Sequence, residues 1–431
     1  MDLLKKLSQI WEGDESAFLV HSSGSLSFSQ IREQAPVDLT KVSTGDVVAI
    51  IGDFDPQSIQ TLIRLFSLGA IVVPLTSDTR SQHEYFFNSA FVDFVVEGDR
   101  VETRNQPLSH DLLELLREES APGLVLFSTG TTGRPKAILH DFRSFLRKFE
   151  TPRPTLRTLN FLLFDHIGGI NTLFHTLFNK GVVIAPESRT VDVILETCAR
   201  FEAEVIPTTP TFLRLLLMSG RIQKEFPPSV KLITYGTELM DEPTLLELCR
   251  ALPEVDFRQT FGMSELGIVR VKSEARDSLF MKIGGEGVET RVKKDVLQIK
   301  SSSRMLGYLN ESSPFDREGW YDSKDVVEVK GDFVKITGRT GDVINVGGLK
   351  FMASEVEREA LGYPGVLLAK VVGRKNPVTG HHVEITLQAR EGVVVEPSGV
   401  IKYLKGRLPS HMVPVKIRIS EVPIGHRFKK S

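Results

Sequence analysis

Residues 45–75 read GDVVAIIGDFDPQSIQTLIRLFSLGAIVVPL. The apolar run at 47–51 has the length and the Val and Ile content of a buried strand, and a second such run follows at 71–75. The residues between them, PQSIQTLIRLFSLGA, carry a helical pattern. A strand, a helix and a strand in this order predict an α/β unit with its helix on one face of the sheet.

The same alternation recurs along the chain. Predicted strands at 123–128, 181–187, 203–209 and 230–236 are followed by predicted helices around 142–149 and at 191–202, 210–220 and 240–252. From about residue 270, alternation with period two predicts antiparallel hairpins. The fold class is therefore α/β: a large N-terminal domain of α/β sheets with a β-rich subdomain (1–340), joined by a hinge to a small α+β C-terminal domain (341–431).

Composition excludes several classes of protein. The 431 residues are 41% hydrophobic and 25% charged, with a net charge of −2, so no global charge favours nucleic acid or a membrane surface. Residues 342–431 are basic, with 14 Lys and Arg against 8 Asp and Glu. Cys198 and Cys249 lie in apolar helical runs and are expected to be core thiols. Without a signal peptide or an apolar span, a cytoplasmic enzyme is expected.

The stretch STGTTGRPK, residues 128–136, follows a predicted strand. It is not a Walker P-loop, because Lys136 lies three residues after Gly133 with Pro135 between them. Glycines allow backbone N–H groups to approach an anion, hydroxyl groups donate to its oxygens, and a lysine neutralises charge. The composition therefore indicates a phosphate-binding loop, with an unliganded surface turn as the alternative.

Further motifs follow in a fixed order: LSFSQI from 26, LFSLGAIVVPL from 65, FDHIGGINTL from 164, TYGTEL from 234, QTFGMSE from 259, GWYDSKD from 319, GRTGDVINVGG from 338 and PIGHRFKKS from 423. With STGTTGRPK, this series resembles the adenylate-forming superfamily of acyl-CoA synthetases, nonribosomal peptide adenylation domains and firefly luciferase. The resemblance covers nearly the whole chain and is closest to the AMP-forming acyl-CoA synthetases. It implies that a carboxylic acid and ATP give an acyl-adenylate, whose acyl group then passes to a thiol.

The resemblance also implies a nucleotide site with Mg²⁺. The phosphate-binding residues would be Ser128, Thr129, Gly130, Thr131, Thr132, Gly133 and Lys136. Ser264 would contact the α-phosphate and Glu265 the metal, since Mg²⁺ prefers hard oxygen ligands. Adenine and ribose would be held by Gly236, Thr237, Glu238, Phe261, Gly262, Asp325 and Arg339. Lys324 departs from the glycine of the family's T-G-D motif, which puts the local backbone conformation in doubt.

The C-terminal part would complete the reaction. Lys429 matches the family's catalytic lysine by spacing, although Phe428 replaces the preceding glycine and Lys430 is an adjacent competitor. Gly341 would be the hinge, Gly347 and Gly348 would line the tunnel for the thiol, and Lys350 falls at a frequent phosphate contact.

Asp165, His166 and Gly169 are assigned to the acyl pocket by the same resemblance. The FDHIGG order favours a non-amino acid as the substrate. Two alternatives stay open: an enzyme that loads an amino or aryl acid onto a dedicated carrier protein, and a nucleotide-binding protein without turnover, suggested by Lys324 and Phe428. The acceptor is CoA or the phosphopantetheine of an acyl or peptidyl carrier protein.

Overall fold

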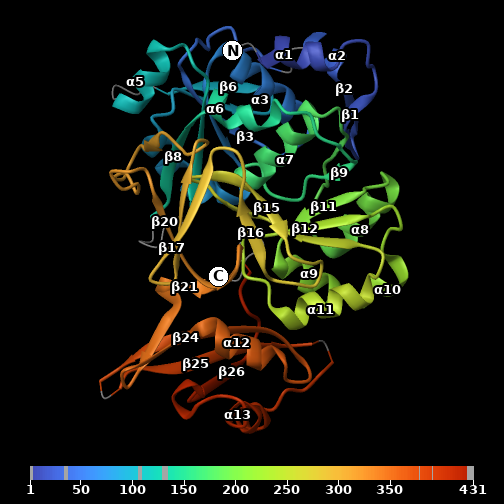
Figure 1. Cartoon of the computed structure of the whole chain (residues 1–431). Helices are drawn as coiled ribbons and strands as arrows, with labels where there is room; N and C mark the ends of the chain where they lie inside the picture. The colour runs from blue at the N-terminus through green and yellow to red at the C-terminus, as the bar shows by residue number, and fades with distance from the viewer. Residues whose placement is uncertain are drawn as a thin grey trace.

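A computed structural model describes residues 3–33, 37–104, 109–128, 134–377, 379–390 and 392–424. Their strands form four sheets, and helices cover the faces of the two sheets nearest the N-terminus (Figure 1). The predicted α/β fold class is confirmed. No described helix is long and apolar enough to cross a membrane.

The first sheet contains the opening stretch of the sequence. Asp55 accepts a hydrogen bond from the Ser58 backbone at 3.0 Å, which starts helix α3 (Pro56–Leu68) between the two strands. These two strands pair in parallel and are buried along their whole length. In spatial order the strands are β19 (Gly307–Tyr308), β8 (Lys136–Asp141), β7 (Gly123–Ser128), β4 (Ile71–Leu75), β3 (Val47–Ile51), β5 (Phe94–Glu97) and β6 (Arg100–Thr103).

The second sheet is mostly parallel, and its helices come from the repeated pattern between residues 180 and 260. Its order is β13 (Asp256–Gln259), β12 (Leu232–Tyr235), β11 (Val205–Thr208), β9 (Thr158–Leu159), β10 (Val183–Ile184), β1 (Ala17–His21) and β2 (Gly24–Ser27).

The predicted hairpins after residue 270 form an antiparallel third sheet. Its order is β14 (Phe261–Met263), β15 (Gly267–Ser273), β16 (Met281–Gly284), β21 (Phe333–Arg339), β20 (Tyr321–Lys330), β18 (Val296–Ser301) and β17 (Val288–Lys293). The fourth sheet contains β23 (Leu349–Met352), β22 (Val343–Val346), β25 (Gly380–Ala389), β24 (Val366–Asn376) and, beside β25, β26 (Lys416–Ile419).

The helices connect and cover these sheets. In chain order the remaining α-helices are α1 (Leu3–Ile10), α2 (Phe28–Glu33), α4 (His83–Ala90), α5 (Asp111–Glu118), α6 (Phe142–Leu146), α7 (Ile167–Phe178), α8 (Val191–Arg200), α9 (Pro210–Met218), α10 (Ile222–Glu225), α11 (Glu242–Ala251), α12 (Ala353–Leu361) and α13 (Pro397–Lys405). The 3₁₀ segments are η1 (Ser77–Gln82), η2 (Arg147–Phe149), η3 (Thr340–Asp342) and η4 (Ser410–Met412).

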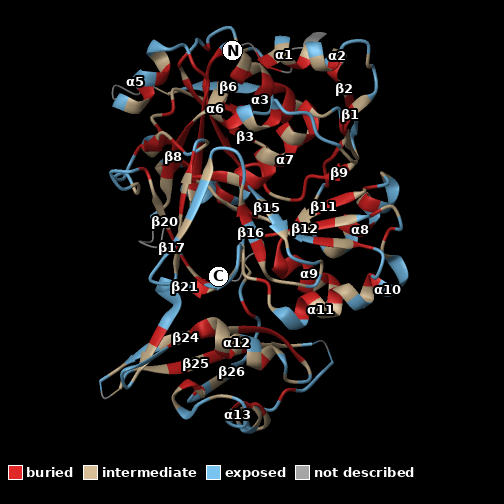
Figure 2. Cartoon of the chain, in the orientation of Figure 1, coloured by how far each residue is buried: buried red, intermediate tan, exposed pale blue. Residues whose placement is uncertain are grey.

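The largest core lies between the first two sheets, where the strands and helix faces are buried (Figure 2). Aromatic rings fill its centre. Phe142 stacks on Phe66 with ring centroids 3.6 Å apart and meets Phe174 edge-on at 5.0 Å. These contacts join α3, α6 and α7 into one packed layer. Cys198 is buried in the second core and Cys249 packs at its edge, so both are free thiols as predicted.

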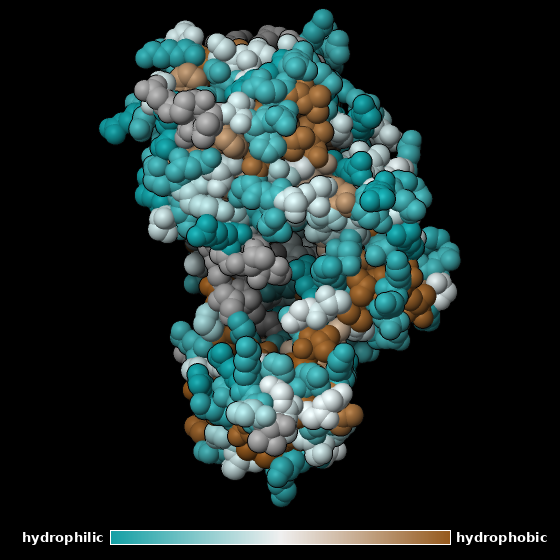
Figure 3. Space-filling model, turned by 90° about the vertical axis from the view of Figure 1, so that its left-hand side faces the viewer, coloured by the Kyte–Doolittle hydropathy of each residue, from teal (hydrophilic) through white to brown (hydrophobic). Residues whose placement is uncertain are grey.

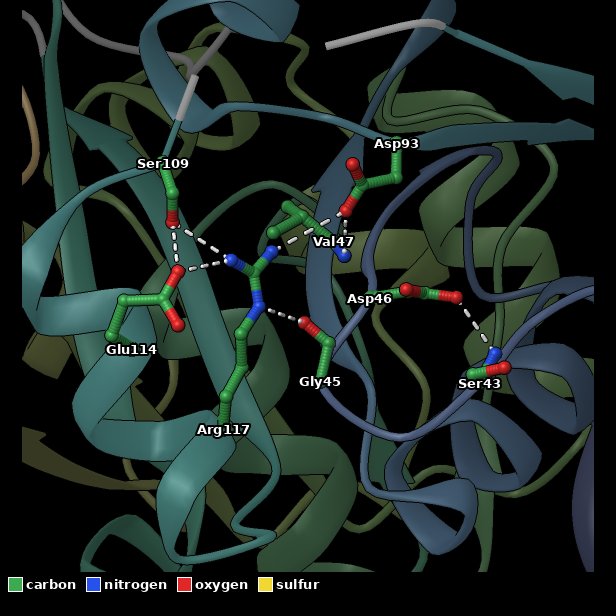
Figure 4. A network of polar contacts seen from close by, with 8 residues as sticks. All are labelled: Ser43, Gly45, Asp46, Val47, Asp93, Ser109, Glu114 and Arg117. Atoms are coloured by element: carbon green, nitrogen blue, oxygen red, sulfur yellow. Dashed lines mark hydrogen bonds and ion pairs between the residues drawn. The ribbon is translucent and has the colours of Figure 1, made fainter. Parts of the chain in front are cut away.

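A polar network fixes α5 against the first sheet (Figure 4). The Arg117 guanidinium donates to the Gly45 carbonyl at 3.1 Å and to Glu114 at 2.7 Å, and it lies 3.7 Å from Asp93. Asp93 in turn accepts from the Val47 backbone at 2.9 Å. Burial raises the pKa of the Asp93 carboxyl, and the adjacent guanidinium opposes this rise.

The fourth sheet and its helices lie beneath the rest of the chain (Figure 1), and the space-filling view shows a lower body set off from the upper part (Figure 3). It has its own hydrophobic core, and few apolar contacts leave it. Leu367, Leu368 and Val422 form one small cluster against which Met218 packs. The chain passes from the third sheet to the fourth between the end of β21 at Arg339 and the start of β22 at Val343. A boundary at 340/341 stays a prediction.

Two strand assignments need correction. The segment after STGTTGRP is strand β8, which pairs antiparallel with β7, so the loop closes a hairpin. The sequence predicts a helix as the next element after this loop. The predicted strand 181–187 is reduced to the two residues of β10. Its flanking residues leave the ladder near Pro186, which cannot donate to a neighbouring strand.

Candidate active site

A cleft of ≈ 690 Å³ lies between the second sheet, the third sheet and α12. Its walls come from loops after β12 and β13, from β20 and β21, and from the first turns of α12. Loops at the carboxyl ends of parallel strands are the usual position for ligands on such sheets. Among the predicted nucleotide residues, the lining includes Thr237, Glu238, Phe261, Gly262, Asp325 and Arg339.

Asp325 and Arg339 form one edge of this cleft. They are opposite each other on the antiparallel strands β20 and β21, and Arg339 Nε donates to Asp325 Oδ1 at 3.0 Å. Asp325 is 4% exposed, and its backbone N–H donates to Ser323 Oγ at 3.0 Å. Burial raises the pKa of Asp325, while the Arg339 guanidinium acts against this shift. Asp325 also lines the cleft, where its carboxylate can accept a hydrogen bond from a ligand.

Lys324, next to Asp325, keeps the backbone conformation that a glycine would adopt. Its φ is +61°, in the left-handed region. The Asp322 side chain supports this turn, because Oδ1 accepts from the Lys324 backbone at 3.0 Å and Oδ2 from the ammonium at 2.9 Å. The ammonium group is therefore paired with its own strand. Lys324, where the family's motif has glycine, therefore leaves the position of Asp325 unchanged, but it adds local backbone strain.

Thr237 and Glu238 line the same cleft, directly after Gly236. A side chain at Gly236 would clash, since its Cβ would lie 2.3 Å from Thr260 Oγ1 and 2.7 Å from the Thr260 carbonyl. Thr237 has a φ of +71°. Glu238 Oε2 accepts from the Thr211 backbone at 3.1 Å and from its hydroxyl at 2.6 Å. The Glu238 carboxylate thus supports the first turn of α9 as well as lining the cleft.

A largely buried ion pair that no sequence motif predicts forms part of the same wall. Arg214 donates to Asp241 through Nε at 3.1 Å and through Nη2, and Asp241 also accepts from the Thr244 backbone at 2.8 Å. Burial acts to raise the pKa of Asp241, but Arg214 and Thr244 hold it below its usual value. No motif of the sequence contains both residues, so only the fold brings them together.

Glu265 lies in a second polar cluster on the third sheet. Its carboxylate is largely buried, and Oε1 accepts from the Tyr308 hydroxyl at 2.8 Å. Tyr321 faces the same carboxylate. Burial and the Glu265 charge raise the pKa of both phenols, so both hydroxyl groups keep their protons. The Ser264 carbonyl accepts from His140 Nε2 at 2.6 Å. Tyr308 is 43 residues from Glu265 and has no sequence signal of its own.

Lys136 joins this cluster to the phosphate-binding loop. It starts β8, directly opposite Ser128 at the end of β7. Its ammonium lies 4.9 Å from the centroid of the Tyr308 ring and 3.9 Å from Glu311 Oε2. The Pro135 carbonyl accepts from Tyr85 at 2.9 Å, which fixes the base of the loop. The predicted phosphate ligands Thr129, Gly130, Thr131, Thr132 and Gly133 lie outside the described residues.

The predicted acyl-pocket residues start helix α7. His166 is its N-cap, and Nδ1 accepts from the Gly168 backbone at 3.0 Å, so any ring proton is on Nε2. Asp165 is buried beside it. A Cβ on Gly169 would lie 2.2 Å from the Leu163 carbonyl, which explains the glycine. The capping contact gives His166 a structural role that is compatible with the predicted gate.

The predicted hinge and tunnel glycines are all at the surface. Gly341 is in η3 between β21 and β22. Gly347 and Gly348 have φ values of +61° and +87° and form the two-residue turn of the β22–β23 hairpin. Positive φ at both central positions is the type I′ pattern. Lys350 pairs with Asn345 across the same hairpin. Lys429, with Phe428 and Lys430, lies outside the described residues.

The described residues suit a bound nucleotide better than a protein-only metal centre. No group of three or more His, Cys, Asp or Glu side chains within them could hold a metal ion. Glu265 offers a single carboxylate held by Tyr308, which suits Mg²⁺ when phosphate oxygens supply further ligands.

Comparisons with known proteins agree with this geometry. The family model described as AMP-binding enzyme matches residues 15–295. The 2-succinylbenzoate–CoA ligase of Bacillus subtilis is 23% identical over 451 aligned positions, covering 93% of this chain and 90% of that protein. A plipastatin synthase chain of the same organism is 22% identical, covering 89% of this chain and 17% of the synthase chain.

The solved structure of the Bacillus subtilis o-succinylbenzoate CoA synthetase with its acyl-adenylate intermediate superposes with a TM-score of 0.78 at 19% identity, over 100% of this chain and 96% of that one. The prediction of an adenylate-forming enzyme, an AMP-forming carboxylate–thiol ligase, is confirmed by these matches. Because the family model covers more than half of the sequence, the chain belongs to the family of AMP-binding enzymes.

Proposed function

We propose that the cleft binds ATP with its ribose at Asp325 and its adenine beside the segment Gly236–Glu238, of which Thr237 and Glu238 line the cleft. One observation carries this proposal: Asp325 is a buried carboxylate that Arg339 fixes in place within the cleft lining. A buried carboxylate of this kind is well suited to a pair of hydroxyl groups. Phe261, also in the lining, offers a ring face to the base.

The phosphates would then extend from the cleft towards Lys136 and the residue 128–136 loop. Lys136 neutralises charge on the outer phosphates, and Ser264 and Glu265 lie at the α-phosphate. Bound Mg²⁺ would supply additional positive charge at the phosphate oxygens. Tyr308 keeps the Glu265 carboxylate in one orientation. The residues align the acid's carboxylate with the α-phosphate. A carboxylate oxygen then bonds to the α-phosphorus, and the bond from that phosphorus to the pyrophosphate oxygen breaks, so pyrophosphate leaves.

In the second half-reaction a thiol attacks the acyl carbon and AMP leaves. Lys429 is proposed for the first step, and movement about Gly341 would bring Gly347 and Gly348 to the second. The acceptor is CoA or a carrier protein. Similarity to 2-succinylbenzoate–CoA ligase supports CoA, and similarity to plipastatin synthase supports a carrier protein as the second candidate. Use of Mg²⁺ and a cytoplasmic location stay predictions.

ATP–pyrophosphate exchange with a panel of fatty, aryl, hydroxy and amino acids tests the proposal. We expect Mg²⁺-dependent exchange with one class of acid, and thioester formation when CoA or a holo-carrier protein is added. Lys429→Ala should abolish exchange but largely spare thiol transfer from added acyl-AMP. Absence of exchange with every acid, in a protein that binds ATP, would reject the proposal in favour of a nucleotide-binding protein without turnover.

A further inference from the structure

Lys148, in η2, carries an amine that the mechanism above does not use. Part of its side chain is exposed, but the Nζ atom is buried and has no hydrogen-bond partner among the described residues. It lies 4.7 Å from the Phe145 ring centroid and 5.1 Å from that of Phe149. Ring faces attract a cation but cannot replace its lost hydration, and a buried ammonium is therefore costly.

The groups around this amine are also basic. Arg153 lowers the pKa of Lys148 electrostatically, after burial, and Arg270 acts in the same way on Arg153. His175, near the C-terminal end of α7, feels both Lys148 and Arg153. Within the described ranges, Lys148, Arg153, His175 and Arg270 make no ion pair with a carboxylate. We refer to these four residues as the basic cluster.

Lys148, the central residue of the basic cluster, lies near the strand that follows Ser264 and Glu265. The Lys148 Nζ is 4.0 Å from where a Cβ would sit on Gly267, two residues after Glu265. His140, which donates to the Ser264 carbonyl, also feels the Lys148 charge. Helix α7 packs against both η2 and β15, with its N-cap His166 at one end and His175 of the basic cluster near the other.

These positions define the direction in which an acid must extend. Its reacting carboxylate has to lie at Ser264 and Glu265, where the α-phosphate is proposed to bind. Its other end then points away from the nucleotide, into the region bounded by α7, η2 and the start of β15. The absence of a side chain at Gly267 leaves the Lys148 amine adjacent to this region.

We propose that the acid activated by this enzyme carries a second anionic group, and that Lys148 binds this group with support from His175 and Arg153. This inference rests on the proposed function and names the substrate class of the same site. A bound anion would supply the missing partner of the amine and offset the repulsion among the cluster. A purely apolar acyl chain would leave the amine without a partner and would gain nothing from it.

Lowering of the Lys148 pKa to about 7, mainly by burial and then by Arg153, agrees with this assignment. Without a ligand, a substantial fraction of the amine is therefore unprotonated near pH 7. An anion beside it would favour the protonated form, so the charge develops where and when the substrate binds.

The test compares matched acids in ATP–pyrophosphate exchange with Mg²⁺. Dicarboxylic acids of increasing length, aliphatic and aryl, are each paired with the monocarboxylic acid of the same skeleton. For wild-type protein we expect kcat/KM for the best dicarboxylate to exceed that of its monocarboxylate by at least about tenfold, the factor for one charge-assisted contact. In Lys148→Met this ratio should fall towards one, mostly through KM for the dicarboxylate.

Lys180→Met is the matched control, because Lys180 follows α7 but lies at the surface near Asp14, outside the basic cluster. It should keep the wild-type ratio. Exchange that is as fast with monocarboxylates in the wild type would overturn the inference and leave the proposed function standing. A dicarboxylate preference that survives in Lys148→Met would also overturn it. No exchange with any acid would reject the proposed function itself, and this inference with it.

Discussion

Asp325 and Lys148 both carry buried ionisable groups within the proposed site, but their surroundings differ in kind. Asp325 faces Arg339 at 3.0 Å, so the opposite charges compensate each other before any ligand arrives. Lys148 faces aromatic rings and the basic residues Arg153 and His175, and its protonated form has no such compensation. The first arrangement suits a neutral partner such as a sugar hydroxyl. The second suits an anion, because only an anion removes the remaining electrostatic cost.

The surroundings of Asp325 and Lys148 indicate what kind of ligand group each end of the site would bind. A group fixed by an opposite charge keeps its geometry and selects by hydrogen bonding. A group held among like charges selects by the sign of its ligand's charge. Substitutions at each end should therefore differ in what they change, as well as in how much.

The largest effect is expected for Asp325→Ala. Loss of the carboxylate removes the acceptor for the ribose and leaves Arg339 without its partner. We expect kcat/KM for ATP in the exchange assay to fall by about 10²-fold or more, the equivalent of about 3 kcal/mol for two charge-assisted hydrogen bonds. Asp322→Ala, on the same strand and paired only with Lys324, is the matched control and should change the rate less than about threefold. Equal losses in both variants would contradict the ribose role.

The second effect concerns stability and pH at Lys148. Its pKa is lowered to about 7 from the ordinary lysine value of 10.5, so between these limits the unfolded chain binds a proton that the folded chain does not. The free energy of unfolding of the wild type should therefore rise as pH increases from about 7 to 10.5. Below pH 7 the folded protein bears the full cost of burying the protonated amine. Lys148→Met removes this term and should stabilise the protein more at pH 6 than at pH 9, by a difference on the order of 2 kcal/mol.

Denaturant unfolding at the two pH values measures this difference. His140, His175 and Arg153 face the same amine, and their own titration largely cancels when the variant is compared with the wild type. Lys180→Met should show no pH-dependent gain. An equal gain from Lys148→Met at both pH values would mean that the folded protein keeps this amine protonated throughout.

A smaller effect is expected for Tyr308→Phe, which removes the hydroxyl that donates to Glu265 at 2.8 Å. The carboxylate would be less well fixed, while the ring under Lys136 remains. We expect kcat for exchange to fall about tenfold with little change in KM for the acid, and the Mg²⁺ concentration for half-maximal rate to rise. A change confined to KM for the acid would assign Tyr308 to substrate binding instead.

The smallest effect is expected for Lys324→Gly. The left-handed φ of +61° disfavours a lysine, so glycine should raise the free energy of unfolding by about 1 kcal/mol or less. The loss of the exposed contact with Asp322 offsets part of this gain. Thermal unfolding measures the shift, and the exchange rate should stay near that of the wild type. A large loss of exchange would show that the Lys324 ammonium contributes to the site.

Much of this architecture follows from local sequence patterns. The buried strands β3 and β4 are predicted from their apolar runs because burial on both faces leaves an unmistakable pattern. The short strands are different: β10 and β19 have two residues each, too few for any periodicity. Strand β8 is not predicted, since its apolar part follows a glycine-rich loop directly and is too short to separate from a helix start.

The residues of the site also divide into those that a sequence motif predicts and those that only the fold brings together. Asp325 and Arg339 are predicted to act together from their motifs, and the register of β20 and β21 places them opposite each other. Tyr308, Arg214 and Lys148 belong to no motif, and their partners come from distant segments. Their contacts depend on packing between sheets, which no local pattern contains.

The two-residue strand β19 has a consequence for how this protein is made. It covers the edge of the first sheet by pairing Gly307 with Leu139 and Tyr308 with Ile138. Ribosomes deliver the chain from its N-terminus, so about 170 residues must be synthesised after β8 before its cover exists. Until then an apolar strand edge is open to other nascent chains. Release of a truncated product ending before residue 300 would leave that edge permanently open, and we expect such fragments to aggregate.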